Sequence, residues 1–350
     1  MSKTAIILFN LGGPDAPQAV RPFLFNLFRD PAILRIPAPF RQLLAWLIAR
    51  RREKTAQTIY AQIGGGSPIL KNTQAQAKAL EQALSGTGEV KCFVSMRYWH
   101  PFSHEILKDI EAFRPDSIVM LPLYPQFSTT TTASSLHNFW ATVQAEDGDL
   151  HARWGELKTR TICCYPEEPG FIRALVELTR TAYEKAKPHG RPRVLFSAHG
   201  LPEKIVQAGD PYPWQCEQTV RAVVREFNIP GLDWILCYQS RVGPLTWIGP
   251  STDEEIRRAG LDKVPLVIVP VAFVSEHSET LVELDMECRA MAGRVGVPFY
   301  IRVPAVGTHP GFIGGLANLV QKALVSEENC LSAAGGRICP RGYKGCGMAP

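Results

Sequence analysis

Short apolar runs, separated by stretches of helical character, constrain the fold of this chain more than any other feature. The runs are rich in Val, Ile and Leu and do not alternate with polar residues, which is typical of parallel strands covered on both faces. We predict strands at residues 5–10, 90–96, 117–123, 194–197, 234–238, 266–271 and 300–303. The return of helices between the runs predicts an α/β protein with parallel, doubly wound sheets in two lobes and a cleft between them.

The length of the chain suits two such lobes. It has 350 residues, and 45% of them are hydrophobic, which can fill two cores of ordinary size. A polar stretch at residues 145–149 indicates a nearby boundary. We expect a first lobe over residues 1–160, a second over 161–310, and a C-terminal helix with a cysteine-rich tail over 311–350 that packs back on the body.

Composition and missing motifs exclude several classes of protein. The net charge of +5 is too small to indicate a nucleic-acid partner. The sequence has neither the glycine-rich loops of nucleotide sites nor the G-x-S-x-G turn of serine hydrolases, so we expect no nucleotide cofactor. It has no run of about 18 apolar residues, and its start lacks the features of a signal peptide. These patterns predict a cytoplasmic protein.

Residues 23–49 form an unusually apolar segment that prolines interrupt and that Arg50, Arg51 and Arg52 follow. One interpretation is ordinary core. The other, which we favour, is an apolar lip that encloses a greasy planar ligand or touches a membrane surface beside a basic collar. The second interpretation adds peripheral membrane association to the cytoplasmic assignment.

A histidine followed by a row of carboxylates comes directly after the apolar run at residues 266–271. His277 precedes Glu279, and Glu283 and Glu287 follow at intervals of four, so an α-helix would align the three carboxylates along one face. A solvated helix face explains this pattern equally well. Because functional groups gather beyond the carboxyl ends of parallel strands, the row is also a candidate path for a metal cation.

Nine ordered motifs resemble those of the ferrochelatase family, and the resemblance extends from about residue 5 to 310. They include Asn10-Leu-Gly-Gly-Pro14, Met96-Arg-Tyr98, Phe196-Ser-Ala-His-Gly-Leu-Pro202, Gln239-Ser-Arg and Ser275-Glu-His-Ser-Glu-Thr280. The family has two Rossmann-like lobes, and its members insert Fe²⁺ into a dicarboxylic porphyrin. The resemblance thus implies that the partners of this chain are ferrous iron and protoporphyrin IX, and that two pyrrole protons leave during terminal haem synthesis.

The resemblance also implies roles for individual residues. His199 and Glu279 would be the central catalytic pair and the first iron ligands, with His277 in support and Glu283 and Glu287 as an acidic path. The walls of the porphyrin pocket would be Leu11, Tyr60, Arg97, Tyr98 and Trp247, and the propionate partners would be Arg51, Arg52 and Ser67. Leu11 implies the protoporphyrin-using type, because coproporphyrin-using members typically carry tyrosine at this position.

Three of the nine cysteines lie close together in the glycine-rich tail, at Cys330, Cys339 and Cys346. Many ferrochelatases carry a [2Fe–2S] cluster, and the microbial variety takes one ligand from inside the chain, for which Cys163 or Cys164 is the candidate here. Thr129 stands where the animal type has its internal cysteine. Structural zinc and unligated thiols are the alternatives to the cluster.

Two other functions remain open at this point. The same residues suit a chelatase that inserts cobalt or nickel into another tetrapyrrole, or a non-enzymatic protein that binds haem or a metal ion. The sequence does not set the oligomeric state, so a homodimer is also open.

Overall fold

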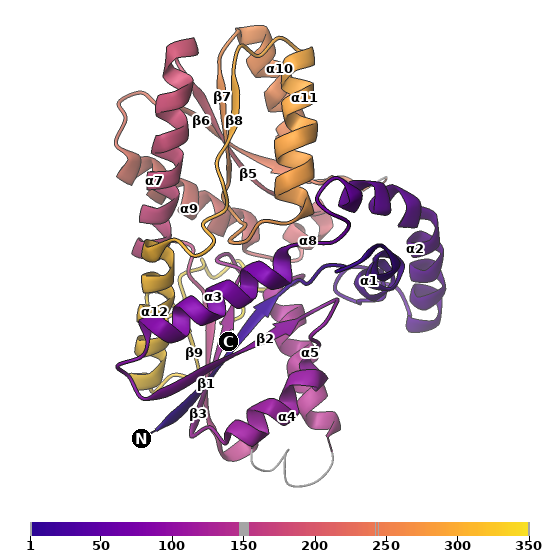
Figure 1. Cartoon of the computed structure of the whole chain (residues 1–350), viewed down its shortest axis with the longest axis vertical. Helices are drawn as coiled ribbons and strands as arrows, with labels where there is room; N and C mark the ends of the chain where they lie inside the picture. The colour runs from indigo at the N-terminus through magenta and orange to yellow at the C-terminus, as the bar shows by residue number, and fades with distance from the viewer. Residues whose placement is uncertain (1, 147–153, 242, 244, 349–350) are drawn as a thin grey trace.

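Two all-parallel β-sheets form the framework of the protein (Figure 1). The structure is a computed structural model of the chain, and it describes residues 2–146, 154–241, 243 and 245–348. The first sheet has the strand order β2-β1-β3-β4-β9 and the second the order β6-β5-β7-β8. The predicted α/β class with two lobes is therefore confirmed.

The seven predicted apolar runs all lie in strands, and two further strands were not predicted. The first sheet comprises β1 (Lys3–Asn10), β2 (Glu89–Met96), β3 (Ser117–Pro122), β4 (Lys158–Cys164) and β9 (Cys330–Ser332). The second comprises β5 (Arg193–His199), β6 (Asp233–Gln239), β7 (Leu266–Pro270) and β8 (Tyr300–Arg302). The boundary expected at residue 160 falls inside β4, and the tail strand β9 pairs with β4 at the edge of the first sheet.

Helices connect the strands and cover the sheets. They are α1 (Val20–Phe28), α2 (Ala38–Ala61), α3 (Ile69–Ala83), α4 (Ser103–Phe113), α5 (Thr132–Ala145), α7 (Pro169–Ala186), α8 (Glu203–Gln207), α9 (Tyr212–Phe227), α10 (Thr252–Asp262), α11 (Cys288–Arg294) and α12 (Pro310–Val325). Two short 3₁₀ segments span Pro17–Ala19 and Lys187–His189. Local sequence explains several helix ends: Ser251 and Glu254 form a capping box at the start of α10, and Glu168 caps α7 ahead of Pro169.

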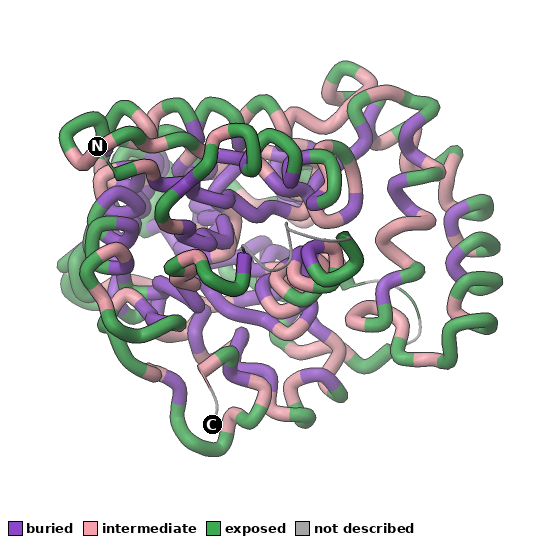
Figure 2. The backbone as a smooth tube through the Cα atoms, turned by 90° about the horizontal axis from the view of Figure 1, so that it is seen from below, coloured by how far each residue is buried: buried purple, intermediate pink, exposed green. Residues whose placement is uncertain are grey.

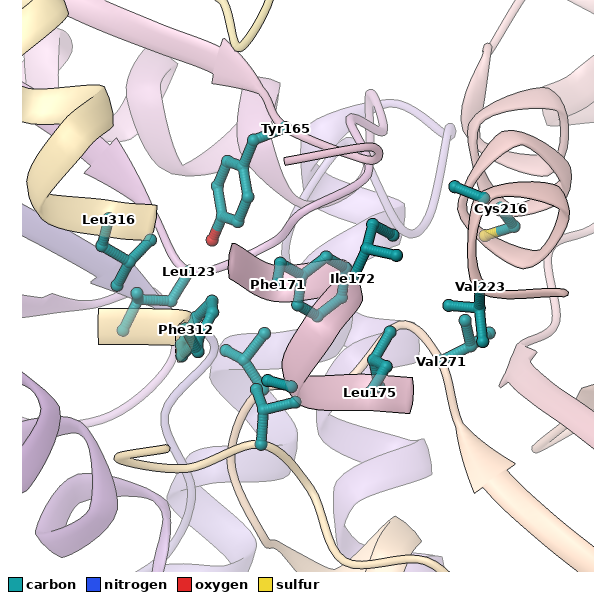
Figure 3. Close-up of a cluster of buried hydrophobic side chains, with 14 of the residues drawn as sticks. Leu123, Tyr165, Phe171, Ile172, Leu175, Cys216, Val223, Val271, Phe312 and Leu316 are labelled. Atoms are coloured by element: carbon teal, nitrogen blue, oxygen red, sulfur yellow. The ribbon is translucent and has the colours of Figure 1, made fainter. Parts of the chain in front are cut away.

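One continuous core joins the two lobes. Phe171 on α7 packs against Phe312 on α12 with ring centres 5.8 Å apart, and side chains of both lobes meet around them (Figure 3). Helix α12 also packs against α3, β3 and β4 of the first lobe. Because this packing is shared, the strand ends of the two sheets are held in a fixed relation to each other.

The apolar segment at residues 23–49 divides between core and surface. Val20, Phe23 and Leu24 of α1 are buried against Tyr60 and Tyr98. On α2, in contrast, large apolar side chains face outward, with exposed fractions of 68% for Phe40, 58% for Leu43, 48% for Leu47, 39% for Trp46 and 38% for Leu44. We call these five side chains the lip. The two helices project from one side of the body, at the right of Figures 1 and 2. Within the described part of the chain, no helix has the length and apolar character to cross a membrane.

Candidate active site

His199 and Glu279 meet at the carboxyl edge of the second sheet. His199 is the last residue of β5, and Glu279 opens a π-helix, η3 (Glu279–Glu287), beyond the end of the neighbouring strand β7. The Nε2 atom of His199 lies 3.6 Å from one carboxylate oxygen of Glu279. Their side chains are 38% and 29% exposed, so both remain accessible to a substrate. The two motifs that the sequence singled out are thus brought together.

His277 approaches the same carboxylate from the other side. Its Nε2 atom lies 3.4 Å from the second oxygen of Glu279. The Nδ1 atom of His277 lies 3.0 Å from the carbonyl of Ser275, and that of His199 lies 2.6 Å from the carbonyl of Gly200. A carbonyl can only accept, so we assign the proton of each neutral ring to Nδ1. Two imidazole lone pairs and a carboxylate therefore converge, and this arrangement is stable only with protons or a cation between them.

The electrostatics of the three groups agree with this geometry. Burial alone would raise the pKa of Glu279, but the charge of His199 and the hydrogen bond with His277 outweigh it and lower the pKa to about 2. Burial would lower the pKa of His277, and the hydrogen bond with Glu279 reverses this and raises it. The site thus favours a carboxylate paired with protonated imidazole.

Glu279, Glu283 and Glu287 form a row that leads from this site to the surface. The row lies on a π-helix, whereas the sequence spacing predicted an α-helix. Glu283 is half-buried and accepts hydrogen bonds from the backbone N–H of Ser240, over 2.7 Å, and from its hydroxyl. Burial, followed by the charge of Glu279, raises the pKa of Glu283. Glu287 is exposed. The three carboxylates thus pass from the histidine pair outward.

Two aromatic residues predicted as pocket walls lie beside the catalytic pair. Trp247 packs on Gly200, where an added Cβ would lie only 3.2 Å from the indole ring. Its indole N–H is buried and has no hydrogen-bond partner among the described residues. Tyr60, on α2, is buried, and burial raises its pKa to about 12; Ser278 hydrogen-bonds to it, and the charge of Glu279 acts on it as well.

Arg97 and Tyr98 are held by a residue that the sequence analysis missed. The carboxylate of Asp30, which is 3% exposed, accepts hydrogen bonds from Arg97 over 2.6 Å, from the hydroxyl of Tyr98 over 2.8 Å and from Ser134 over 2.5 Å. Asp30 directly precedes Pro31, so its sequence context indicates a turn residue and gives no sign of this network. The one sequence signal that could have pointed to Asp30 is an acidic side chain shortly after the apolar helix α1.

The remaining predicted substrate-binding residues lie in the first lobe, in the loop after β1, on α2 and just before α3. Leu11 is half-buried and packs in the same cluster as Tyr60 and Tyr98. Ser67 is half-buried and lies against Gly13. Arg51 is exposed, whereas Arg52 is half-buried with its guanidinium 6.0 Å from the centre of the Phe28 ring.

The tail cysteines come together with the internal pair. Cys163 and Cys164 are buried in one cluster against which the half-buried Cys330 packs, and the pairing of β4 with β9 shifts register between Ile162 and Cys164. Hydrogen bonds with Cys164, Cys330 and Cys346 raise the pKa of Cys163, and hydrogen bonds with Cys163 and Cys339 lower that of Cys346. As the side chains stand, no group of three or more His, Cys, Asp or Glu residues in the described ranges is arranged to hold a metal ion.

Comparison with known proteins identifies the family of the chain. A family profile described as Ferrochelatase matches residues 3–324. The chain belongs to the ferrochelatase family. It is 52% identical to a ferrochelatase of Caulobacter vibrioides over 98% of this chain and 97% of that protein, and 51% identical to one of Phenylobacterium zucineum over 98% and 97%.

A solved structure supports a chelatase-like fold. SirB from Bacillus subtilis with Fe³⁺ superposes with a TM-score of 0.53 at 13% identity, covering 93% of this chain and 96% of that chain. This likeness shows a chelatase fold alone. Family membership shows that the chain is an enzyme of haem biosynthesis that inserts a metal ion into a porphyrin.

Proposed function

We propose that this enzyme inserts Fe²⁺ into protoporphyrin IX and releases two pyrrole protons. The observation that carries the proposal is the convergence of two imidazole Nε2 atoms on the carboxylate of Glu279. Metallation requires bases for the pyrrole protons and ligands that replace the waters of the incoming ion. An imidazole lone pair beside a carboxylate supplies both.

The roles of the three residues follow from their contacts. The Nδ1–H of His199 is directed to the Gly200 carbonyl, so its Nε2 atom is the one that accepts a pyrrole proton or contacts iron. Once His199 is protonated, the carboxylate of Glu279 stabilises the imidazolium across 3.6 Å. Protonated His277 donates from Nε2 to the other oxygen and holds the carboxylate in place.

The surrounding residues would bind the macrocycle and conduct ions. Leu11, Tyr60 and Trp247 offer apolar and aromatic surface for a flat π-ligand, and Arg97 and Tyr98 reinforce the same wall. Arg51 and Arg52, with Ser67, would meet the propionates, because a guanidinium pairs well with a carboxylate. Glu283 and Glu287 would form the path for cations or protons between His199 and the surface.

An anaerobic assay with purified protein, Fe²⁺ and protoporphyrin IX tests this function. We expect the fluorescence of the free porphyrin to fall over many turnovers. Saturation after one equivalent would instead indicate a binding protein, and turnover with Co²⁺ or Ni²⁺ on another tetrapyrrole alone would contradict the choice of substrates.

We further propose that the tail thiols bind a [2Fe–2S] cluster. Cys330, Cys339 and Cys346 would supply three ligands and Cys163 the fourth, since Cys163 hydrogen-bonds to both Cys330 and Cys346. The donor set suits the group, because four thiolates are the usual ligands of such clusters. When bound, the cluster would fasten the tail to the body. A red-brown protein with thiolate-to-iron absorption is expected, and a colourless, zinc-containing preparation would contradict the proposal.

The lip is proposed to contact a membrane surface from the cytoplasmic side. Five large apolar side chains are exposed on α2, and the guanidinium groups of Arg21 and Arg50 lie 5.8 and 5.4 Å from the ring of Trp46. Apolar side chains beside basic ones favour the interface of an anionic bilayer. Tyr60 lies in the last turn of the same helix, about 20 Å along the axis from Leu47, so a porphyrin taken from the membrane would approach the pocket along α2.

A further inference from the structure

Gln76 is a fully buried amide of the first lobe whose hydrogen bonds all go to loops of the second lobe, two of them to the loop that precedes His277. It lies on α3, which packs against β1 and β2 of the first sheet and crosses the middle of the molecule in Figure 1. Its Nε2 atom donates to the carbonyl of Val274 over 2.8 Å and to that of Gly307 over 3.0 Å. Its Oε1 atom accepts from the hydroxyl of Ser275 over 3.0 Å. Both donors and the acceptor are therefore used.

One of these bonds links Gln76 to His277 through Ser275. The carbonyl of Ser275 receives the Nδ1–H of His277 over 3.0 Å, and this bond fixes which ring nitrogen faces Glu279. Ser275 lies between β7 and η3 in a segment without regular backbone pairing. Its orientation therefore depends on side-chain partners, because buried backbone groups of irregular segments need such partners.

Two neighbours on the same face of α3 strengthen this link. Asn72 donates to the carbonyl of Glu276 over 3.0 Å. Thr73 accepts from the side chain of Asn10, the last residue of β1, over 3.0 Å. Gln76 thus belongs to a helix face that holds the strand end of one lobe and the catalytic segment of the other.

We propose that Gln76 is a positioning residue for metal insertion, acting through Ser275 to hold His277 with its Nε2 atom toward Glu279. The inference rests on the proposed roles of His277 and Glu279. Gln76 itself has no contact with His199, His277 or Glu279 among its hydrogen bonds. Its effect on the reaction is indirect, through the orientation of one imidazole ring.

The direct test measures the tautomer of His277 and does not depend on turnover. In ¹⁵N-histidine NMR of the protein at a pH above the raised pKa of His277, with the signal assigned by its loss in His277→Asn, the wild type should show the neutral ring protonated at Nδ1. Gln76→Met keeps the size of the side chain and removes its three hydrogen bonds. We expect this variant to give an averaged or Nε2-protonated signal. An unchanged tautomer would overturn the proposal.

Steady-state kinetics provide the second test. Gln76→Met should lower kcat at least about tenfold, the scale found when a partner that orients a ligating histidine is removed, and should change KM for porphyrin less than about twofold. Gln74→Met, on the exposed face of α3, is the matched control for composition and should leave both constants unchanged. Leu80→Ala, a buried site on the same helix, controls for lost stability and should retain kcat.

Ser275→Ala completes the design and replaces Gln76→Met if that variant fails to fold. Because the two residues act in one chain, the double variant should have the kcat of Gln76→Met alone and not the product of the two losses. Multiplicative losses would overturn the proposal. Absence of Fe²⁺ insertion by the wild type would instead contradict the proposed substrates, and the NMR result would still decide the role of Gln76.

Discussion

The side-chain amide of Gln215 donates a hydrogen bond to the sulfur of Cys339 over 3.1 Å. Gln215 is fully buried on α9, and its oxygen accepts from the backbone N–H of Phe127 in the first lobe over 2.8 Å. One amide therefore connects the tail to both lobes. An N–H donor directed at sulfur favours the thiolate, which is the form that binds iron.

Replacement of Gln215 should therefore weaken iron retention in the tail. We expect Gln215→Leu to lose its thiolate-to-iron absorption to a chelator about 10–100-fold faster than the wild type, the usual scale for a partner of a metal ligand. Gln82→Leu, a control outside the thiol cluster, should behave like the wild type. Equal rates of bleaching for all three proteins would contradict a role for this hydrogen bond.

Loss of the imidazole at position 199 should stop proton removal from the porphyrin. We expect His199→Ala to lower kcat by about 10²–10⁴, the contribution typical of a general base, with porphyrin binding nearly intact. The expected result is that metallation stops, while binding of porphyrin still quenches its fluorescence as in the wild type. Normal turnover in this variant would remove His199 from the centre of the mechanism.

The stability conferred by Glu279 should depend on pH at acidic values. Its folded-state pKa is lowered to about 2 from an ordinary value of 4.5, so its contribution is present above about pH 4.5 and disappears as the pH falls through about 2. The raised pKa of His277 gives the opposite sign: its contribution is present below 6.5 and is lost at higher pH, through the folded value. The difference in urea midpoint between wild type and Glu279→Gln should thus be larger at pH 6 than at pH 3 or 9.

Removal of the Asp30 carboxylate should destabilise the protein and release Arg97. An uncompensated buried guanidinium costs about 3–5 kcal/mol, so we expect Asp30→Ala to lower the free energy of unfolding by that amount. Asp109→Ala, at an exposed position on α4, should change it by less than about 0.5 kcal/mol. Chemical denaturation of both variants makes the comparison, and equal stability would show that Asp30 contributes little.

Polar substitution in the lip should reduce binding to anionic vesicles and leave stability unchanged. Phe40→Ser and Leu43→Ser alter side chains that are 68% and 58% exposed, so their folded-state packing changes little. Leu261→Ser is the matched control, because Leu261 is 84% exposed but lies on α10. Sedimentation with phosphatidylserine vesicles should separate the lip variants from this control, and equal sedimentation would contradict membrane contact by the lip.

Sequence patterns predicted the parts of the fold that depend on local, continuous signals. Seven apolar runs were sufficient to place seven strands, but β4 begins with Lys-Thr-Arg-Thr and β9 has three residues, so neither shows an apolar run. The spacing of Glu279, Glu283 and Glu287 indicated a helix. Its π geometry could not be predicted, because a spacing of four residues does not separate an α-helix from a π-helix.

In the candidate site, too, residues within local motifs could be predicted and residues that act through distant contacts could not. His199, His277 and Glu279 were recognisable from motifs at strand ends, and the structure brings them together. Asp30 and Gln76 were missed because each acts through contacts to residues far along the chain, 67 residues away for Arg97 and 198 for Val274. Neither residue type is unusual at a turn or on a helix, so only the tertiary structure reveals their partners.

The position of β9 has a consequence for how the protein is made. Residues 330–332 form the edge strand beside β4 in a sheet whose first strand starts at Lys3. The sheet of the first lobe therefore cannot be completed before these residues have left the ribosome. Until then the edge of β4 in the nascent chain has no partner strand, and truncation before residue 330 would leave that edge open to pairing with other chains.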